Sequence, residues 1–471
     1  MEILKPDLCV IGGGSAGLSV AAGAVQMGAS VVLIEGDEMG GDCLNTGCVP
    51  SKALLAAGKA AHAMTAGGAF GVRPVTPEID FAAAKAHVRA VIEGIAPQDS
   101  VARFEGLGVT VIQAMARFVS PDEVIADGRR IRARRFVIAT GSRPTAPPIP
   151  GLESVGFLTN ETIFGLSERP RRLLIIGGGP IGCEMAQAHR RLGSEVVVLE
   201  AAAALGREDP ELAAIALKAL RAEGIVIRDN VKIASARRAG DEIALTLEDG
   251  EEISGDALLV AAGRRANIDD LGLADAKIET TKTGVKVDKG LRATNRRVYA
   301  IGDAAGGLQF THLAAYHAGL VLRSALFRLP AKVRDDHIPR VTYLDPELAQ
   351  VGLTEAEARA QHGDKLEVHR AEYAENDRAR ADNRTTGFTK VMIVKGRPVG
   401  ASIVGAQAGD LIAIWALALS SRLKIADVAN FIAPYPTYGE LAKRAAGAYF
   451  TPRLFESALV KRAVRLLAKL G

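Results

Sequence analysis

Two cysteines lie close together in the segment Gly40–Lys52, with four residues between Cys43 and Cys48. Two glycines precede the pair and Pro50 follows it, so we expect the thiols at a turn. In a reducing compartment such a pair is more often redox-active than structural. A zinc site would need further ligands at metal spacing, and only a lone His62 follows nearby. The pair therefore predicts thiol–disulfide chemistry, and we predict no metal site.

Composition limits the other functions that this chain can have. With 471 residues it is long enough for about three domains, and 48% of the residues are hydrophobic. A net charge of +4 with 4% aromatic residues argues against nucleic acid as a partner. No signal peptide or membrane span is evident, so we expect a cytoplasmic protein. The remaining cysteines, Cys9 and Cys183, fall in a predicted strand and a predicted helix, where we expect small buried side chains.

Redox chemistry at a thiol pair needs an electron source, and the start of the chain predicts one. The apolar strand Asp7–Ile11 runs into the loop Gly12–Gly17, a helical pattern continues to Met27, and the strand Ser30–Ile34 ends at Glu35. This is a βαβ unit with G-x-G-x-x-G and an acid at the expected distance. The glycines let a pyrophosphate approach the helix N-terminus, and the acid accepts hydrogen bonds from a ribose.

The same construction returns 165 residues later. The strand Arg172–Ile176 leads into Gly177–Gly182, a helix follows, and the strand Glu195–Leu199 ends at Glu200. One glycine motif is a weak signal, whereas two copies with matched acids predict two dinucleotide sites. An acid at the position of Glu200 favours a free ribose 2′-hydroxyl and repels a 2′-phosphate. We therefore predict NAD(H) rather than NADP(H) at the second site.

The remaining segments complete the expected fold. The strand Val298–Asp303 follows the second nucleotide unit, and we assign it to the first domain. From about Ile338 the pattern is α+β without a nucleotide loop. Expected strands are Val341–Tyr343, Ala349–Gly352, Leu366–Arg370 and Phe388–Val394, and expected helices are Thr354–Gln361 and Gly409–Arg422. We predict an α/β protein whose domains cover 1–148 with 273–336, 149–272, and 337–471.

The tail Glu456–Leu470 is an amphipathic helical pattern. Apolar residues from Leu459 to Leu470 share one face, and the basic side chains lie opposite, at Lys461, Arg462, Arg465 and Lys469. Two interpretations follow. The helix packs on the protein, across a dimer interface for example, or it makes a peripheral membrane contact.

Taken together, these motifs resemble the flavin-dependent pyridine nucleotide–disulfide oxidoreductases over essentially the whole chain. The segments that match are Gly12–Gly17 with Glu35, Gly40–Lys52, Ala139–Gly141, Gly177–Gly182, Ala262–Arg264, Gly302–Asp303, and Leu344–Pro346 with Val351–Thr354. The resemblance implies two Rossmann-like domains, for FAD and for an inserted NAD site, followed by a C-terminal α+β dimerisation domain. It also implies a homodimer.

The resemblance implies roles for individual residues as well. Cys48 would be the thiol nearer the flavin, and Cys43 would meet the substrate. Lys52 would lie near the flavin and pair with Glu184, while Asp303 would bind the flavin's ribityl or phosphate region. The predicted cofactor-binding residues are Gly12, Gly14, Ser15, Ala16, Gly17, Glu35, Gly41, Lys52, Ala116, Thr140, Gly141, Ser142, Asp303, Gly177, Gly179, Pro180, Ile181, Gly182, Glu200 and Gly263.

One position departs from relatives that act on dithiols or glutathione. Those relatives carry a His-Pro, with a Glu four residues after the proline; here the stretch has Tyr435, Pro436 and Glu440. A tyrosine has a pKa of roughly 10 against roughly 6.5 for histidine, so it is a poor base at neutral pH. Mercuric reductases resemble this chain in having that tyrosine, but they also have a C-terminal cysteine pair, and the last cysteine here is Cys183. Asp42, where relatives often have threonine, is expected to raise the pKa of the neighbouring Cys43 thiol.

The sequence therefore predicts a flavoprotein oxidoreductase that passes electrons between NAD(H), FAD and a Cys43–Cys48 disulfide, with Tyr435 in place of the acid/base histidine. The predicted substrate is a small-molecule or protein-bound disulfide. One alternative is an NADH-dependent reductase of a quinone, dye or mercuric ion. Another is a redox-responsive binding subunit whose flavin is structural.

Overall fold

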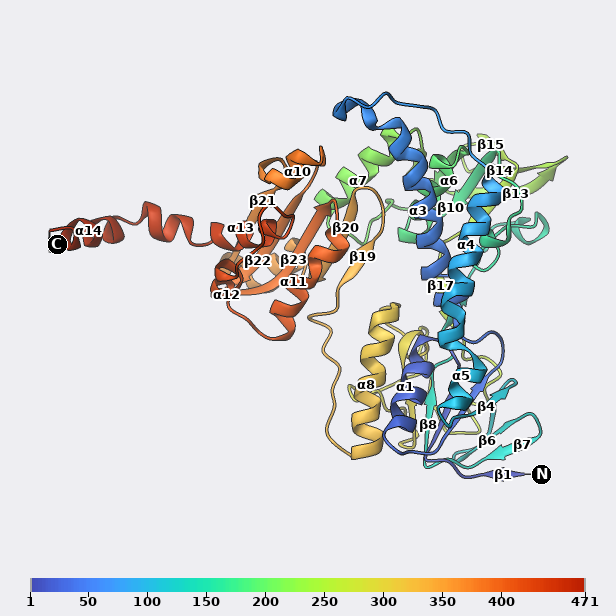
Figure 1. The fold of residues 1–471 in the computed structure, drawn as a ribbon. Helices are drawn as coiled ribbons and strands as arrows, with labels where there is room; N and C mark the ends of the chain where they lie inside the picture. The colour runs from blue at the N-terminus through green and yellow to red at the C-terminus, as the bar shows by residue number, and fades with distance from the viewer. Residues whose placement is uncertain (1, 470–471) are drawn as a thin grey trace. The chain divides into compact units, whose positions relative to one another are not determined.

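A computed structural model describes residues 2–469 of the chain (Figure 1). The chain forms two compact units. The first contains the chain up to Thr65, Pro74–Ala201 and Val231–Val333. The second contains Ala66–Arg73, Ala202–Asn230 and the chain from Arg334 onward. Residues 202–230, which we assigned by sequence to the second nucleotide domain, thus pack within the unit that holds the C-terminal part.

A parallel sheet of five strands forms the centre of the first nucleotide-binding part. Its order is β18-β8-β2-β3-β4, and the strands are β18 (Val298–Ala300), β8 (Arg135–Ile138), β2 (Leu8–Ile11), β3 (Val31–Glu35) and β4 (Thr110–Gln113). Apolar side chains fill these strands because both faces of a parallel sheet are covered. The helices α1 (Ser15–Gln26) and α8 (Thr311–Phe327) share one core with the sheet, and Cys9 is fully buried, as predicted. The pairing of β18 with β8 returns the chain to this sheet after the second nucleotide unit.

The second nucleotide-binding part repeats this local plan. Here β10 (Arg172–Ile176) lies between β11 (Glu195–Leu199) and β16 (Ala257–Val260), all parallel, and α6 (Pro180–Arg191) follows β10. Cys183 on α6 is fully buried, which confirms its expected place in the core. Three smaller sheets accompany these parts. The first is mixed, because β1 (Ile3–Leu4) pairs in parallel with β7 (Arg129–Ile131), while β7, β6 (Glu123–Ala126) and β5 (Arg117–Ser120) are antiparallel. The other two are antiparallel: β13 (Ile233–Ala239), β14 (Glu242–Leu247) and β15 (Glu252–Gly255); and β9 (Ser142–Pro144) with β17 (Arg264–Ala266).

A short helix and a long one carry the thiol segment. These are α2 (Gly41–Asn45) and α3 (Cys48–Thr65), and α4 (Phe81–Ile95) and α5 (Val101–Gly106) follow along the chain. α3 packs against α6, so the thiol segment is tied to the second glycine loop. Close packing there uses Gly58 on α3, where a Cβ would approach Ala188 O at 3.3 Å.

The second unit is built on an antiparallel sheet in the order β19-β20-β23-β22-β21. The strands are β19 (Arg340–Thr342), β20 (Glu347–Gly352), β23 (Arg397–Gly405), β22 (Phe388–Val394) and β21 (Leu366–Glu372). The helices are α7 (Pro210–Ala222), α9 (Glu355–His362), α10 (Asp377–Ala381), α11 (Ala408–Ser420), α12 (Ile425–Asn430), α13 (Glu440–Ala448) and α14 (Ala458–Leu467). The short strand β12 covers Val226–Arg228. β22 has the predicted bounds, whereas the central strand β23 was not predicted. Trp415 of α11 is fully buried in the hydrophobic core of this unit.

An internal charge cluster holds α7 in this unit. Lys390 of β22 is 2% exposed, and its Nζ lies 2.9, 2.6 and 2.9 Å from carboxylate oxygens of Asp209, Glu211 and Glu355. A buried ammonium needs such partners, because leaving it unpaired would cost several kcal/mol. Asp209 also caps α7 by accepting the Glu211 N–H. The cluster explains why α7 packs with the C-terminal sheet, whereas β12 (Val226–Arg228) pairs with β11 at the edge of the second nucleotide-binding sheet.

Candidate active site

The two glycine loops have matching geometry. Gly12 and Gly177, each directly after a central strand, have φ of 110° and 111°, which disfavours any residue with a Cβ. At the first loop the Gly13 N–H donates to the Glu35 carboxylate, and at the second the Gly178 N–H donates to Glu200 Oε2 at 2.7 Å. Both predicted acids therefore lie beside the loops that they were paired with in the sequence.

The helices after these loops begin without side-chain caps. Gly14 precedes α1 and Gly179 precedes α6; neither residue provides a capping side chain, and neither first turn holds an acid. Backbone N–H groups at such a helix start favour an anion. At the first loop Gly14 also approaches Gly41, where an added Cβ would lie 2.8 Å from the Gly14 Cα. The residues present thus fit a dinucleotide pyrophosphate at each helix.

Other predicted flavin-binding residues gather around the ends of β8 and β18. Thr140 Oγ1 donates to Asn267 O at 2.6 Å, Gly141 has φ of 70°, and Ser142 Oγ donates to Asp303 Oδ2 at 2.6 Å. Burial raises the pKa of the Asp303 carboxyl. Ala116 is buried beyond β4 in the core of the same part.

The thiols meet where α2 gives way to α3. Cys43 lies within α2 and Cys48 is the first residue of α3; both are free thiols, hydrogen bonded to each other. Cys48 Sγ also lies 3.3 Å from Thr311 Oγ1 at the start of α8. Thr311 was not predicted, since 263 residues separate it from Cys48 and no motif marks it.

The two thiols have opposite acidities. The hydrogen bond from Cys43 lowers the pKa of Cys48 to about 6 against the opposing effect of burial, and Thr311 and Lys52 lower it further. The pKa of Cys43 is raised well above its usual range by its hydrogen bond to Cys48, by burial and by the Cys48 charge. The helix start also favours a thiolate at Cys48. At neutral pH the site therefore holds a Cys48 thiolate beside a protonated Cys43.

Lys52 provides the cation of the site. Its Nζ lies 2.8 Å from Glu184 Oε2, and the Glu184 side chain is only 6% exposed. The structure therefore brings together the two residues that the resemblance paired. The ion pair links α3 to α6 and keeps a positive charge one helical turn after Cys48.

Asp42 acts on the acidity of Cys48, where its charge opposes the lowered pKa. Its carboxylate accepts hydrogen bonds from Asn160 Nδ2 at 2.8 Å and Thr46 Oγ1 at 2.9 Å, and lies 3.3 Å from Arg264 Nη2. An effect of Asp42 on the Cys43 thiol stays a prediction. Asn160 is a further residue that sequence reasoning missed, because it belongs to no motif.

Comparison with known proteins agrees with this geometry. The family model described as pyridine nucleotide-disulphide oxidoreductase matches residues 6–318, and the model of its dimerisation domain matches 338–446. This chain belongs to the pyridine nucleotide–disulphide oxidoreductase family. Enzymes of this family depend on FAD and use NAD(P)H.

Relatives with different names are equally similar to this chain. A mercuric reductase of Lysinibacillus sphaericus is 34% identical over 93% of this chain and 82% of its own length. A dihydrolipoyl dehydrogenase of Bacillus subtilis is 34% identical over 94% of this chain and 96% of its own length. The structure of the HOCl-induced flavoprotein disulfide reductase RclA from Escherichia coli has a TM-score of 0.84 and 28% identity, over 94% of this chain and 99% of that one; another structure of RclA is a Cu(II) complex.

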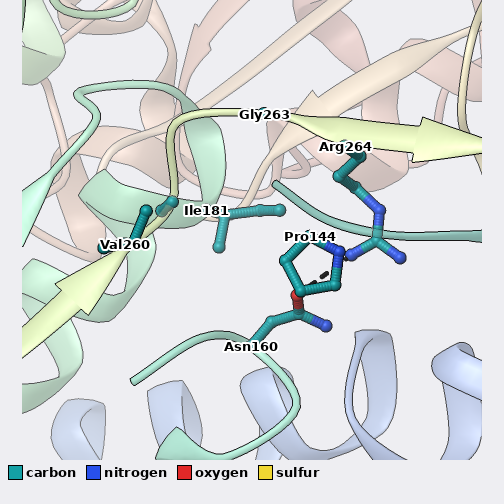
Figure 2. Close-up of a pocket in the computed structure, with 7 residues that line it drawn as sticks. Pro144, Asn160, Ile181, Val260, Gly263 and Arg264 are labelled. Carbon is teal, nitrogen blue, oxygen red and sulfur yellow. Dashed lines mark hydrogen bonds between the residues drawn. The ribbon is translucent and has the colours of Figure 1, made fainter. Parts of the chain in front are cut away.

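A pocket of this oxidoreductase joins the second glycine loop to the thiol segment. It is lined by Pro144, Asn160, Ile181, Val260, Ala261, Gly263 and Arg264 (Figure 2). Arg264 Nη1 donates to Asn160 Oδ1 at 3.1 Å, and both residues contact Asp42 next to Cys43. Ile181 and Gly263 come from the predicted nicotinamide part. One small cavity thus has the coenzyme loop on one side and the residues that hold the dithiol loop on the other.

The tyrosine that departs from the dithiol-specific members lies in the second unit. Tyr435 is 71% exposed, and its hydroxyl donates to Asp377 Oδ2 at 3.0 Å. That hydrogen bond and the Asp377 charge raise the pKa of Tyr435. Glu440 is the first residue of α13, and its buried Oε2 has no hydrogen-bond partner within residues 2–469. The Tyr435 hydroxyl is therefore protonated at neutral pH.

Proposed function

We propose that this chain is an NAD(H)-linked flavoprotein that passes electron pairs between the coenzyme and the Cys43–Cys48 pair. The observation that carries the proposal is the asymmetric thiol pair, with a Cys48 pKa of about 6 and a strongly raised Cys43 pKa. Such asymmetry assigns separate tasks: one thiolate persists at neutral pH while the other thiol exchanges with the acceptor. When bound, FAD supplies the two-electron carrier between nicotinamide and thiols.

The exchange with a disulfide acceptor follows from these roles. Cys43, once deprotonated, attacks one sulfur of the acceptor and expels a thiolate. The Cys48 thiolate then attacks the Cys43 sulfur, expels the second thiolate and leaves a Cys43–Cys48 disulfide. Two electrons pass from the chain's thiols to the acceptor. The two released thiolates take up two protons, one from Cys43 and one from solvent.

Glu200 supports NAD(H) as the coenzyme. Its carboxylate lies at the end of β11 and accepts the Gly178 N–H, so a negative charge stands beside the second glycine loop. A ribose 2′-phosphate would be repelled there. Ile181, Gly263 and Arg264 line the pocket into which we place the nicotinamide end of the coenzyme. Lys52 and Glu184 hold the adjoining helices together.

We also infer a homodimer, supported by the match of residues 338–446 to a dimerisation domain. In this proposal the Glu440 region of each chain completes the active site of its partner, as the family resemblance implies. A cytoplasmic location remains a prediction. Within residues 2–469, no helix has the length and apolarity needed to cross a membrane.

Reduction of a soft metal ion is a second candidate, favoured by Tyr435. Deprotonating Cys43 for attack on a disulfide calls for a base, and Tyr435 with its raised pKa cannot be one. A soft metal ion needs no base, because it binds thiolates and displaces the thiol proton itself. Mercuric reductases among the relatives fit this candidate.

One experiment separates these acceptors. The flavin-loaded dimer is supplied with NADH, and coenzyme oxidation is followed with lipoamide, glutathione disulfide, Hg²⁺, Cu²⁺ and a soluble quinone in turn. Turnover with a disulfide or a metal ion that disappears in both Cys43→Ser and Cys48→Ser supports the thiol relay. Turnover that survives both substitutions with every acceptor would contradict it.

A further inference from the structure

The last helix of the chain has no packing partner in its own unit. Helix α14 (Ala458–Leu467) follows a π-helical turn at Pro452–Glu456, and Ser457 caps it by accepting the Val460 N–H at 3.4 Å. None of its residues is buried; Leu459 is 79% exposed and Val464 60%. The helix is therefore not packed into the core of its own unit within residues 2–469. A second copy and a lipid surface remain as occupants of its apolar face.

The apolar and basic side chains of α14 are fully segregated. At about 100° per residue, its large apolar residues and Ala463 fall within an arc of roughly 160°. Lys461, Arg462 and Arg465 fall on the opposite side. Lys469 continues that side beyond the helix, while Leu470 lies outside the described residues. Just before α14, Leu454 and Phe455 are also exposed apolar side chains, at 47% and 70%.

The charge of the tail favours one of the two candidate partners for the apolar face of α14. The segment after Glu456 has four basic residues and no acid, whereas the whole chain has 58 Lys and Arg against 54 Asp and Glu. Without those four cations the remaining counts are equal, at 54 each, so the tail holds the whole net charge of the chain. A second copy thus offers no net negative charge to this helix. An anionic lipid surface offers both negative headgroups and an apolar layer beneath them.

The position of α14 along the chain agrees with a role outside the dimer contact. The dimerisation-domain model matches residues 338–446, and α14 begins 12 residues beyond that match. The surfaces that this model describes therefore do not include the helix.

We propose that α14 docks the enzyme on an anionic lipid bilayer. Leu459, Val464 and Leu467 enter the boundary between headgroups and acyl chains, while the basic side chains face lipid phosphates. The helix lies along the surface and does not cross the bilayer. This inference concerns location only, and it holds for any electron acceptor.

Vesicle flotation of the full-length, flavin-loaded protein tests the proposal. Phosphatidylcholine vesicles with a phosphatidylglycerol fraction should carry the protein upward, and pure phosphatidylcholine should not. Lys461→Gln with Arg465→Gln should weaken this partition about 25-fold at low salt, at about fivefold per cation. Leu459→Gln with Val464→Gln should abolish flotation, because the apolar insertion is lost. Lys218→Gln with Lys282→Gln, which removes two exposed lysines outside α14, serves as the matched control and should float like wild type.

Three results would overturn the proposal. They are absence of flotation with anionic vesicles, equal flotation of wild type with both vesicle types, and conversion of the dimer to a monomer by the Leu459/Val464 variant. The last would show that a second copy covers the apolar face. Because no residue of α14 is buried, all variants should keep wild-type flavin content and melting temperature. A deletion from Ser457 onward checks the same point independently of the substitutions.

Discussion

The dithiol segment and the Tyr435 segment differ in how firmly contacts within this chain hold their side chains. Around the thiols, Cys48 contacts Thr311, Lys52 pairs with Glu184, and Asp42 is held by Asn160 and Arg264. Around Tyr435, the ring is 71% exposed. There the buried Glu440 Oε2 lacks a hydrogen bond in the described part of the chain. The thiol segment thus has several hydrogen-bonded and ion-paired contacts in the described part of the chain, whereas the Tyr435 segment has few.

This difference separates what the family shares from what distinguishes its members. The partners that set the acidity of the thiols come from the nucleotide-binding parts, and these match the family model. In our proposal, the proton chemistry toward the acceptor depends on one side chain in the second unit, Tyr435. Relatives named for mercuric ion and for dihydrolipoamide are equally similar, at 34% identity. Overall similarity therefore indicates the electron donors, NAD(P)H and FAD, but it does not distinguish between acceptors. The acceptor must be inferred from individual side chains.

Substitution of Cys48 in the dithiol segment should reduce turnover more than any other substitution. Cys48→Ser removes the stable thiolate, and we expect turnover with any thiol-dependent acceptor to fall about 10³-fold or more. The measurement is NADH oxidation at saturating acceptor. Cys9→Ala, which alters a buried thiol outside the pair, should retain turnover. A Cys48→Ser enzyme within tenfold of wild type would remove the dithiol from the mechanism.

Restoring a base in the second segment should have the next largest effect. Tyr435→His introduces a side chain that accepts a proton near neutral pH, so turnover with lipoamide or glutathione disulfide should rise about tenfold to 100-fold. Tyr435→Phe is the matched control, and it should not raise that turnover. Equal rates for the histidine variant and wild type would mean that proton transfer at this position does not limit disulfide turnover.

Coenzyme choice should respond more modestly. Glu200→Gln removes the negative charge beside the second glycine loop, and the ratio of kcat/KM for NADPH over NADH should rise about tenfold. Glu195→Gln, an exposed acid at the other end of the same strand, provides the control. Wild-type enzyme that prefers NADPH would contradict the role given to Glu200.

The smallest effects concern the acidity of Cys48, where two neighbours act in opposite directions. Lys52→Met should raise the Cys48 pKa above about 6, and Asp42→Asn should lower it by a smaller amount. Ultraviolet thiolate absorbance against pH measures both shifts; in wild type the signal should disappear as pH falls through about 6, because protonation removes the thiolate. Lys59→Met, on the exposed side of the same helix, should leave the midpoint unchanged. Shifts of the same sign in both variants would refute the electrostatic account.

Local patterns were enough to predict the nucleotide-binding parts. Gly12 and Gly177 lie at strand ends with positive φ, and their acids Glu35 and Glu200 contact the loops, because strand, turn and helix follow one another within a few residues. The strand Phe388–Val394 was predicted with its observed bounds, since it contains the continuous apolar run Val391–Val394.

Non-local features were not predictable from such patterns. The central strand β23 contains Pro398 and Gly400, which are turn residues in most contexts, and only pairing with β20 and β22 makes them part of a sheet. Thr311 and Asn160 reach the thiol segment through the fold, from positions distant in sequence. Asp42 was predicted to act on its neighbour Cys43, whereas its effect on Cys48 depends on the fold that brings Cys48 close to it.

The central claim is that Cys48 is the thiolate that faces the bound flavin. Anaerobic reduction with NADH, followed by recording long-wavelength flavin–thiolate charge-transfer absorbance as pH is varied, tests it most directly. The account predicts a band that persists in Cys43→Ser, is absent in Cys48→Ser, and in wild type is lost as pH falls through about 6. A band that survives Cys48→Ser, or a wild-type enzyme without any such band, would contradict it.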